Sequence, residues 1–273
     1  MIPGARVIPA RRSAYDEDVR DEERTVPLET PVAIEINGIA YAVMMATPCD
    51  IEDFVTGFLL SEGLAQVDEI GPVMVHPVES EGGVGGLVAR VTLPPERAAP
   101  IMERARRRLG DSSCGICGIE SIELALRPLP HLGRARPIAP AAIRVALDAM
   151  RAGQVLGRAT AATHAAAFAD ATGAIVALRE DVGRHNALDK VIGALARTGR
   201  DPASGFLLVT SRCSYELVEK AVRARCPLLV AISAPTDLAV RRAEAAGLAL
   251  AVVARDDTML WVTGARMEMA HDL

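Results

Sequence analysis

Two cysteines stand three positions apart in the segment 111–118, which reads DSSCGICG. Cys114 and Cys117 are each followed by a glycine, and two serines precede them, so that Ile116 is the only bulky side chain near either sulfur. Glycine allows the backbone to adopt unusual conformations and to approach another surface closely. A pair of accessible thiols in such a loop indicates sulfur chemistry rather than packing.

Three kinds of chemistry use a Cys-x-x-Cys pair. A structural zinc site needs four ligands, but the other cysteines are single and the nearest downstream histidine, His131, stands alone. A thioredoxin-like redox pair follows a strand and opens a helix, whereas the residues before this pair are expected to end a helix. A sulfur carrier needs only a reactive, accessible thiolate that accepts a sulfur atom as a persulfide. The sequence favours the carrier and leaves the redox pair as an alternative.

The composition excludes several classes of protein. A net charge of −5 argues against a broad nucleic-acid-binding surface, and no stretch approaches 18 apolar residues, so we expect no membrane span. Free cysteines without an export signal predict a cytoplasmic protein. Aromatic residues are 3% of the chain, which predicts a core of small aliphatic side chains. Of the 30 basic residues only Lys190 and Lys220 are lysines.

The first half of the sequence is expected to hold an arm and a small domain. Residues 1–25 are highly charged without a long apolar run, which predicts a flexible N-terminal arm. Residues 26–135 are predicted to form an α+β domain that ends in the cysteine loop and a proline-rich connector. Two hairpins are expected there, one of them around Asn37-Gly38. Between the hairpins, Asp50 is expected to cap a helix that Gly63 ends.

Apolar strands alternate with helices in residues 136–273. This pattern predicts an α/β domain with a largely parallel sheet covered on both faces. The expected strands are 164–168, 174–178, 206–210, 228–232 and 248–254, with a possible edge strand at 259–262, and the expected helices are 140–150, 186–196, 215–223 and 238–246.

Such sheets bind ligands at the carboxyl ends of their strands, where helix N-termini direct a positive dipole at anions. The loops expected there supply hydroxyls and arginines for phosphate, and carboxylates for a purine edge such as that of guanine. We therefore expect a nucleotide-like pocket, although each hydroxyl taken alone is equally consistent with a helix cap. Its candidate residues are Arg184, His185, Ser211, Arg212, Ser233, Thr236 and Arg255, while the role of His164 is open.

Five motifs, in order from about residue 26 to the C-terminus, resemble those of the FdhD family, which are accessory sulfurtransferases of formate dehydrogenase. They are ETPVAI from Glu29, DFVTGFLLSEG from Asp53, SCGICG from Ser113, EDVGRHNALDK from Glu180 and SAPT from Ser233. The resemblance implies a cytidine-deaminase-like three-layer C-terminal unit with a smaller α+β N-terminal domain. A zinc deaminase is excluded, because Ala187 stands where that signature needs a glutamate after His185.

The resemblance also implies a function. It implies a sulfur carrier that takes persulfide sulfur from a cysteine desulfurase and passes it to the bis-molybdopterin guanine dinucleotide cofactor, before the cofactor enters formate dehydrogenase. It further implies a homodimer, a guanine nucleotide site and no resident metal. A cofactor-binding chaperone without sulfur transfer is the alternative from another class.

The functional residues of the family fall on two segments of this sequence. Cys114 corresponds to the persulfide-bearing cysteine and Cys117 to its partner thiol. The cofactor-contacting stretch corresponds to Val253, Ala254, Arg255, Asp256, Asp257 and Thr258. This stretch lacks the aromatic and glycine-rich residues that are usual in the family.

Overall fold

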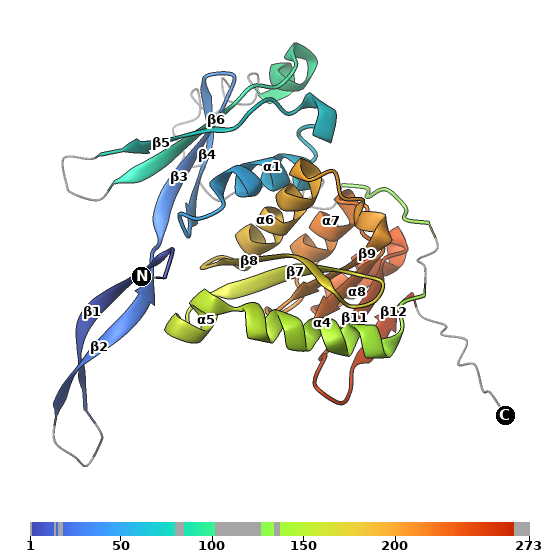
Figure 1. Ribbon diagram of the computed structural model, residues 1–273. Coiled ribbons are helices and arrows are strands. Elements are labelled where there is room, and N and C mark those ends of the chain that lie inside the picture. The colour runs from blue at the N-terminus through green and yellow to red at the C-terminus, as the bar shows by residue number, and fades with distance from the viewer. Residues whose placement is uncertain are drawn as a thin grey trace.

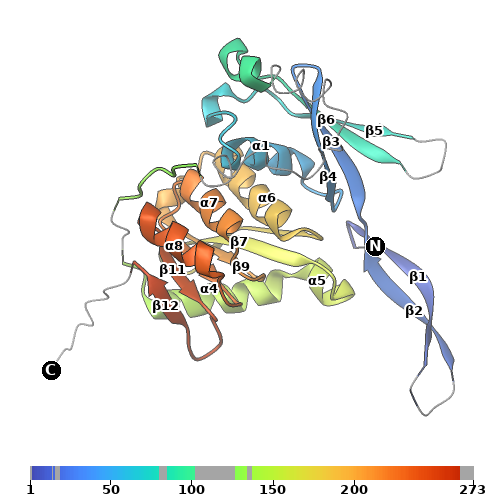
Figure 2. The ribbon, with the colours of Figure 1, turned by 180° about the vertical axis from the view of Figure 1, so that it is seen from behind.

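The computed structural model describes residues 2–13, 15, 19–79, 85–101, 127–133 and 137–264. Within these ranges the strands form a two-stranded ribbon, a four-stranded sheet and a six-stranded sheet, accompanied by helices (Figures 1 and 2). The protein is therefore a mixed α/β structure. None of the helices that the structure describes is long and apolar enough to cross a membrane.

The ribbon consists of β1 (Ala5–Arg12) and β2 (Arg20–Pro27), which pair antiparallel and extend away from the rest of the molecule (Figure 1). Regular strands thus occupy most of the segment expected to be a flexible arm. An exposed ribbon needs no apolar run, because cross-strand ion pairs and the backbone ladder stabilise it. Arg11 lies 2.8 Å from Asp21, and Arg12 lies 2.7 Å from Glu22.

The four-stranded sheet has the order β4-β3-β6-β5. Its strands are β3 (Thr30–Ile36), β4 (Ile39–Ala46), β5 (Met74–Val78) and β6 (Gly86–Val91), and a short 3-10 helix η1 (Val67–Glu69) precedes β5. Both predicted hairpins are present. Asn37 and Gly38 have φ angles of 50° and 78°, the left-handed conformations that a tight two-residue hairpin turn requires.

Helix α1 (Ile51–Ser61) packs against this sheet and is buried on nearly every side. The prediction that Asp50 caps the helix is wrong, because Asp50 has a left-handed φ of 53° and its side chain makes no capping hydrogen bond. The carboxylate instead lies 3.5 Å from the Arg179 guanidinium. Gly63, with a φ of 69°, does end the helix, since the amide of Leu64 donates to the carbonyl oxygen of Leu59.

The six-stranded sheet has the order β12-β11-β10-β9-β7-β8. Its strands are β7 (His164–Asp170), β8 (Ile175–Asp181), β9 (Gly205–Val209), β10 (Leu228–Ala231), β11 (Ala249–Val252) and β12 (Leu260–Thr263). β9, β10 and β11 are parallel, but β7 and β12 are antiparallel to their neighbours. The sheet is therefore mixed rather than largely parallel, because the tight turn at 171–174 makes β7 and β8 a hairpin.

Helices cover both faces of this sheet (Figures 1 and 2). α4 (Pro140–Gly153) packs on one face, and α5 (Val155–Thr160) follows it. The other face carries α6 (Arg184–Arg197), α7 (Tyr215–Arg223) and α8 (Asp237–Ala246), and a short 3-10 helix η2 (Pro202–Ser204) leads into β9. The predicted bounds of α7 match those in the structure.

The two parts of the molecule meet where α1 crosses α6. A Cβ atom built on Gly57 would lie 1.8 Å from the carbonyl oxygen of Asp189, and one built on Gly193 would lie 1.9 Å from that of Asp53. The two helix backbones thus touch at the crossing, and any side chain there would separate them.

Candidate functional site

The carboxyl ends of four strands meet at one side of the six-stranded sheet, called the carboxyl edge below. β8 points the same way as β9, β10 and β11, because β7 is antiparallel to both β8 and β9. Backbone hydrogen bonds join the neighbouring loops: the amide of Cys213 donates to Ala234 (3.1 Å), and the amide of Val253 donates to Ser233 (3.3 Å). The fold thus aligns the loops in which the candidate binding residues lie.

At the β8 end of the carboxyl edge, charged side chains gather around the N-terminus of α6. His185 Nε2 lies 2.9 Å from Glu216 Oε2 on α7, and Arg184 lies 4.0 Å from the same carboxylate. The contact with His185 lowers the pKa of Glu216. Burial, together with the charge of Arg184, lowers the pKa of His164 at the start of β7, so His164 is neutral at pH 7. This end of the edge thus brings together the Arg184 guanidinium, two imidazoles and the Glu216 carboxylate.

The hydroxyl residues in the middle of the carboxyl edge have mixed roles. Thr236 accepts from the amide of Ala239 and so caps α8, as the helix-cap alternative expects. Ser211 is buried and donates to the carbonyl oxygen of Arg212, whose side chain is exposed. The carbonyl of Ser233 accepts from Val253, as described above.

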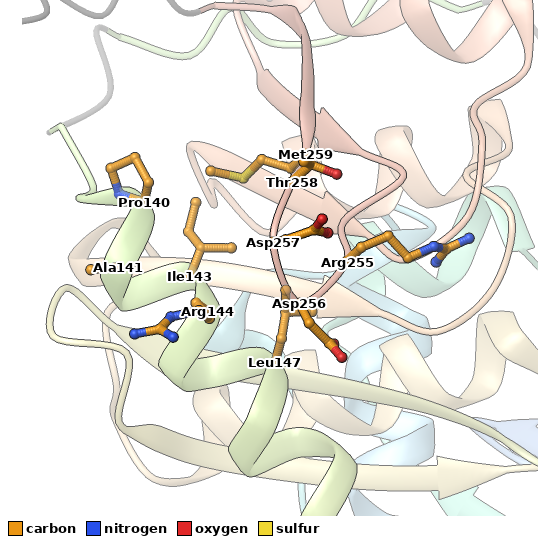
Figure 3. A pocket seen from close by; sticks show the side chains of 10 residues that line it. All are labelled: Pro140, Ala141, Ile143, Arg144, Leu147, Arg255, Asp256, Asp257, Thr258 and Met259. Atoms are coloured by element: carbon orange, nitrogen blue, oxygen red, sulfur yellow. The ribbon is translucent and has the colours of Figure 1, made fainter.

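The stretch from Val253 to Thr258 follows β11 and borders a cavity of about 200 Å³ against α4 (Figure 3). Arg255, Asp256, Asp257 and Thr258 line one wall, and Ile143, Arg144 and Leu147 of α4 are among the residues of the other. The role of α4 was not predicted, since helical periodicity alone does not show which loop a helix faces. The cavity is smaller than the roughly 300–1,000 Å³ of sites that enclose a drug-sized ligand, and suits a single base or phosphate group.

One hydrogen bond to the backbone and one ion pair hold this loop. Arg255 Nη1 donates to the carbonyl oxygen of Ile232 at 2.6 Å, and Arg151 of α4 donates to Asp256 at 2.6 Å. Val253 has a φ of 51°, which is an outlier for a β-branched residue and costs on the order of 1–3 kcal/mol. Such strain is typical of functional loops.

The candidate residues do not all converge on one point. β8 and β11 are separated by β7, β10 and β9. With four strand intervals of about 4.8 Å each, Arg184 and Arg255 follow strands that are roughly 19 Å apart. Only an extended ligand reaches both ends of the carboxyl edge.

Cys114 and Cys117 lie outside the described residues. Arg127, the first described residue after them, donates to the carbonyl oxygen of Glu62 at the end of α1 (2.7 Å). The Arg127 side chain is thus held beside the end of α1.

The other three cysteines are poor nucleophiles. Burial raises the pKa of the Cys213 and Cys226 thiols to about 12, and it also raises the pKa of Cys49, which is partly exposed. The thiolate, not the thiol, is the nucleophile in sulfur chemistry. These three cysteines therefore stay protonated near neutral pH.

Most polar residues of the EDVGRHNALDK motif join the two parts of the molecule instead of facing the carboxyl edge. Lys190 and Asp181 are fully buried, with Nζ and Oδ2 2.7 Å apart, and Lys190 also donates to the carbonyl oxygen of Thr47. Lys220 lies 2.9 Å from Asp189 and donates to Ser61 of α1. Burial lowers the pKa of Lys220, but the charges of Asp189 and Glu62 more than reverse this, so the net pKa is raised.

Sequence reasoning assigned no partner to these residues. The available signal was the presence of charges on helix faces that are otherwise apolar. In the part of the chain that the structure describes, no group of three or more histidine, cysteine or acidic side chains is arranged to hold a metal ion.

Comparisons with known proteins show which family and which relatives this chain resembles. The model of the FdhD/NarQ family matches residues 27–267. The protein named sulfur carrier protein FdhD from Xanthomonas euvesicatoria pv. vesicatoria (strain 85-10) is 50% identical over 256 residues, covering 93% of this chain and 89% of that protein. Its namesake from Bordetella petrii is 46% identical over 222 residues, covering 81% and 78%.

A solved structure shares the fold. The crystal structure described as a formate dehydrogenase accessory protein from Desulfotalea psychrophila aligns with a TM-score of 0.75 over 97% of this chain and 99% of that one, at 21% identity. At that identity the likeness shows the fold alone.

Proposed function

The chain belongs to the FdhD/NarQ family, and from that premise we propose that it is a sulfur carrier in which Cys114 accepts sulfur as a persulfide. The observation that carries the proposal is the state of the other cysteines. Because Cys49, Cys213 and Cys226 are held as thiols, nucleophilic sulfur chemistry falls to Cys114 and Cys117.

The loading step is a thiol–persulfide exchange. The Cys114 thiolate attacks the outer sulfur of a persulfide on a cysteine desulfurase, a new S–S bond forms on Cys114, and the donor cysteine leaves as a thiolate. Charge and sulfur both balance, and no external oxidant is needed. Cys117 is the neighbouring thiol that assists release of the sulfur.

Mass spectrometry after incubation with a cysteine desulfurase and cysteine tests this step. We expect the peptide that contains Cys114 to gain the mass of one sulfur atom, and this gain to disappear on reduction. Peptides that contain Cys213 or Cys226 serve as internal controls and gain nothing, because their thiols are buried. A disulfide between Cys114 and Cys117 without sulfur gain would instead establish the redox alternative.

The acceptor that we propose is bis-molybdopterin guanine dinucleotide, destined for formate dehydrogenase and bound along the carboxyl edge. The candidate residues form a row that is longer than one phosphate group, and an extended nucleotide can occupy such a row. The arginines and the helix N-termini along it suit the phosphates of that nucleotide. The same proposal includes four further points: a cytidine-deaminase-like fold of the six-stranded unit, a homodimer, a cysteine desulfurase as the donor, and a cytoplasmic location. The first three rest on membership of the family, and the location rests on cysteines that are free thiols.

Asp257 is the residue through which we test guanine binding. It lines the cavity, and a carboxylate accepts hydrogen bonds from the guanine ring N–H and amino groups. Hydrogen bonds to charged groups contribute about 1.5–3 kcal/mol, so Asp257→Asn is expected to weaken GDP binding roughly ten- to a hundredfold. Calorimetry with GDP and ADP measures this, and ADP binding should change little.

The matched control is Glu244→Gln, which makes the same charge change at an exposed position on α8. Its GDP affinity should equal that of the unaltered protein. If the Asp257→Asn variant binds GDP as tightly as the unaltered protein does, guanine is not recognised in this cavity.

A further inference from the structure

Four buried polar side chains lie where the residues around Thr47, called the Thr47 segment below, contact the start of α6. They form the interface cluster, which consists of Thr47, Asp181, Asn186 and Lys190. Thr47 lies between β4 and α1, whereas the other three lie at the end of β8 and in α6. Each member of the cluster is less than 5% exposed, so water does not compete for its hydrogen bonds.

The cluster ties the β8–α6 turn to the four-stranded part of the molecule from both directions. Asp181 Oδ2 accepts from the amide of Thr47 at 2.9 Å and from Lys190 Nζ at 2.7 Å, and Lys190 Nζ donates back to the carbonyl oxygen of Thr47 at 3.0 Å. The Thr47 hydroxyl accepts from the amide of Val182 at 3.2 Å. The segment around Thr47 is thus held by the carboxylate, the ammonium group and the turn itself.

The same carboxylate also shapes the turn. Asp181 Oδ1 accepts from the amide of Gly183 at 2.8 Å and from Asn186 Nδ2 at 2.9 Å, and Asn186 Nδ2 also donates to the carbonyl oxygen of Met45 at 2.8 Å. Arg184 and His185 lie between Gly183 and Asn186. Their backbone is therefore fixed on both sides, while their side chains remain partly exposed at the carboxyl edge.

We propose that the Asp181–Lys190 pair is a positioning pair: it sets Arg184 and His185 in place for an anionic ligand and makes that placement depend on contact with the Thr47 segment. Neither charge reaches the carboxyl edge, because both side chains are fully buried. Their effect on a ligand is therefore indirect. The proposal rests on the nucleotide-binding role proposed above for the edge.

The stability of the folded protein does not by itself require Asp181 and Lys190 to be charged. Replacing a buried ion pair by uncharged groups of similar size is often neutral, whereas removing one partner leaves an unpaired buried charge. Lys190→Met alone is therefore expected to destabilise strongly. The double variant Asp181→Asn/Lys190→Met removes both charges at nearly constant volume and should recover much of the melting temperature. The two effects, on folding and on placement, can be separated in this double variant.

Two measurements on the double variant test the positioning role. Hydrogen exchange of the peptide that spans the β8–α6 turn should become about tenfold faster, because the contacts of Lys190 with Asp181 and with the carbonyl oxygen of Thr47 are lost. In the proposed placement, the base of GDP lies in the Asp257 cavity and its diphosphate extends along the edge toward Arg184 and His185. The Kd for GDP should rise about tenfold, because these two side chains are no longer held in place.

Arg197→Met is the matched control. Arg197 lies in the last turn of the same helix and pairs across the same interface with Asp53, which keeps Arg179 as a second partner. This variant should lose some stability but leave both the turn exchange and the GDP affinity unchanged.

The outcomes separate the two proposals. A higher Kd for GDP and a faster-exchanging turn in the double variant, with neither change in Arg197→Met, support the positioning pair. A double variant that binds GDP and exchanges like the unaltered protein overturns the positioning role and leaves the edge site standing. Absence of GDP binding by the unaltered protein overturns the edge site, and the positioning role with it.

Discussion

Replacing Cys114 by alanine is expected to abolish sulfur loading and to reduce formate dehydrogenase activity in cells to the background of a strain without the protein. Alanine offers no thiolate, and the three cysteines that the structure describes cannot substitute, because burial raises the pKa of each thiol. Persulfide mass spectrometry and an assay of formate dehydrogenase in a complemented deletion strain measure the two effects.

Two controls define what the result means. Cys49→Ala removes the partly exposed thiol and should leave both measurements unchanged. GDP binding by Cys114→Ala should also be unchanged, since the residues that we propose to bind it lie on the carboxyl edge. A Cys114→Ala protein that supports full formate dehydrogenase activity would favour the cofactor-binding chaperone over the carrier.

Replacing Gly57 by alanine is expected to lower the free energy of unfolding by about 3 kcal/mol or more, the upper part of the range for overpacked cores. The added Cβ would lie 1.8 Å from the carbonyl oxygen of Asp189, which is backbone of α6 and cannot rotate away. At roughly 2–4 °C per kcal/mol for domains of 150–250 residues, the melting temperature should fall by roughly 6–12 °C. Thermal unfolding followed by circular dichroism measures the change.

Gly133→Ala is the control for the loss of a glycine as such. Among the residues that the structure describes, and apart from its neighbours in the chain, no atom lies within 4 Å of a Cβ built at Gly133. Gly193→Ala, on the opposite side of the crossing, should reproduce the loss seen at Gly57. A Gly57→Ala protein as stable as Gly133→Ala would mean that the two helices do not touch in solution.

Local features of the fold could be predicted because their signals are local. Asn37 and Gly38 adopt the positive φ angles that their residue types favour, and Gly63 ends α1 for the same reason. Asp50 shows the limit of such rules. It has the residue type of a helix cap, but its carboxylate lies near Arg179, more than a hundred positions away in the sequence.

Features that depend on distant pairs could not be predicted. The residue types at the strand ends indicated which loops would share an edge, but not the antiparallel position of β7, which sets the distance between Arg184 and Arg255. The wall that α4 contributes to the cavity was not predicted, and the contacts of Asp181 and Lys190 with Thr47 depend on a fold that sequence spacing does not encode.

The burial of both lysines has a practical consequence. Lys190 is fully buried, and the side chain of Lys220 is 8% exposed, so every accessible side-chain cation at the surface is an arginine or a histidine. Amine-directed crosslinkers and acylating reagents therefore find no lysine on the folded protein. Acylation of Lys190 or Lys220 would report that α1 has come away from α6, which makes the native sequence its own probe of how often the two parts separate.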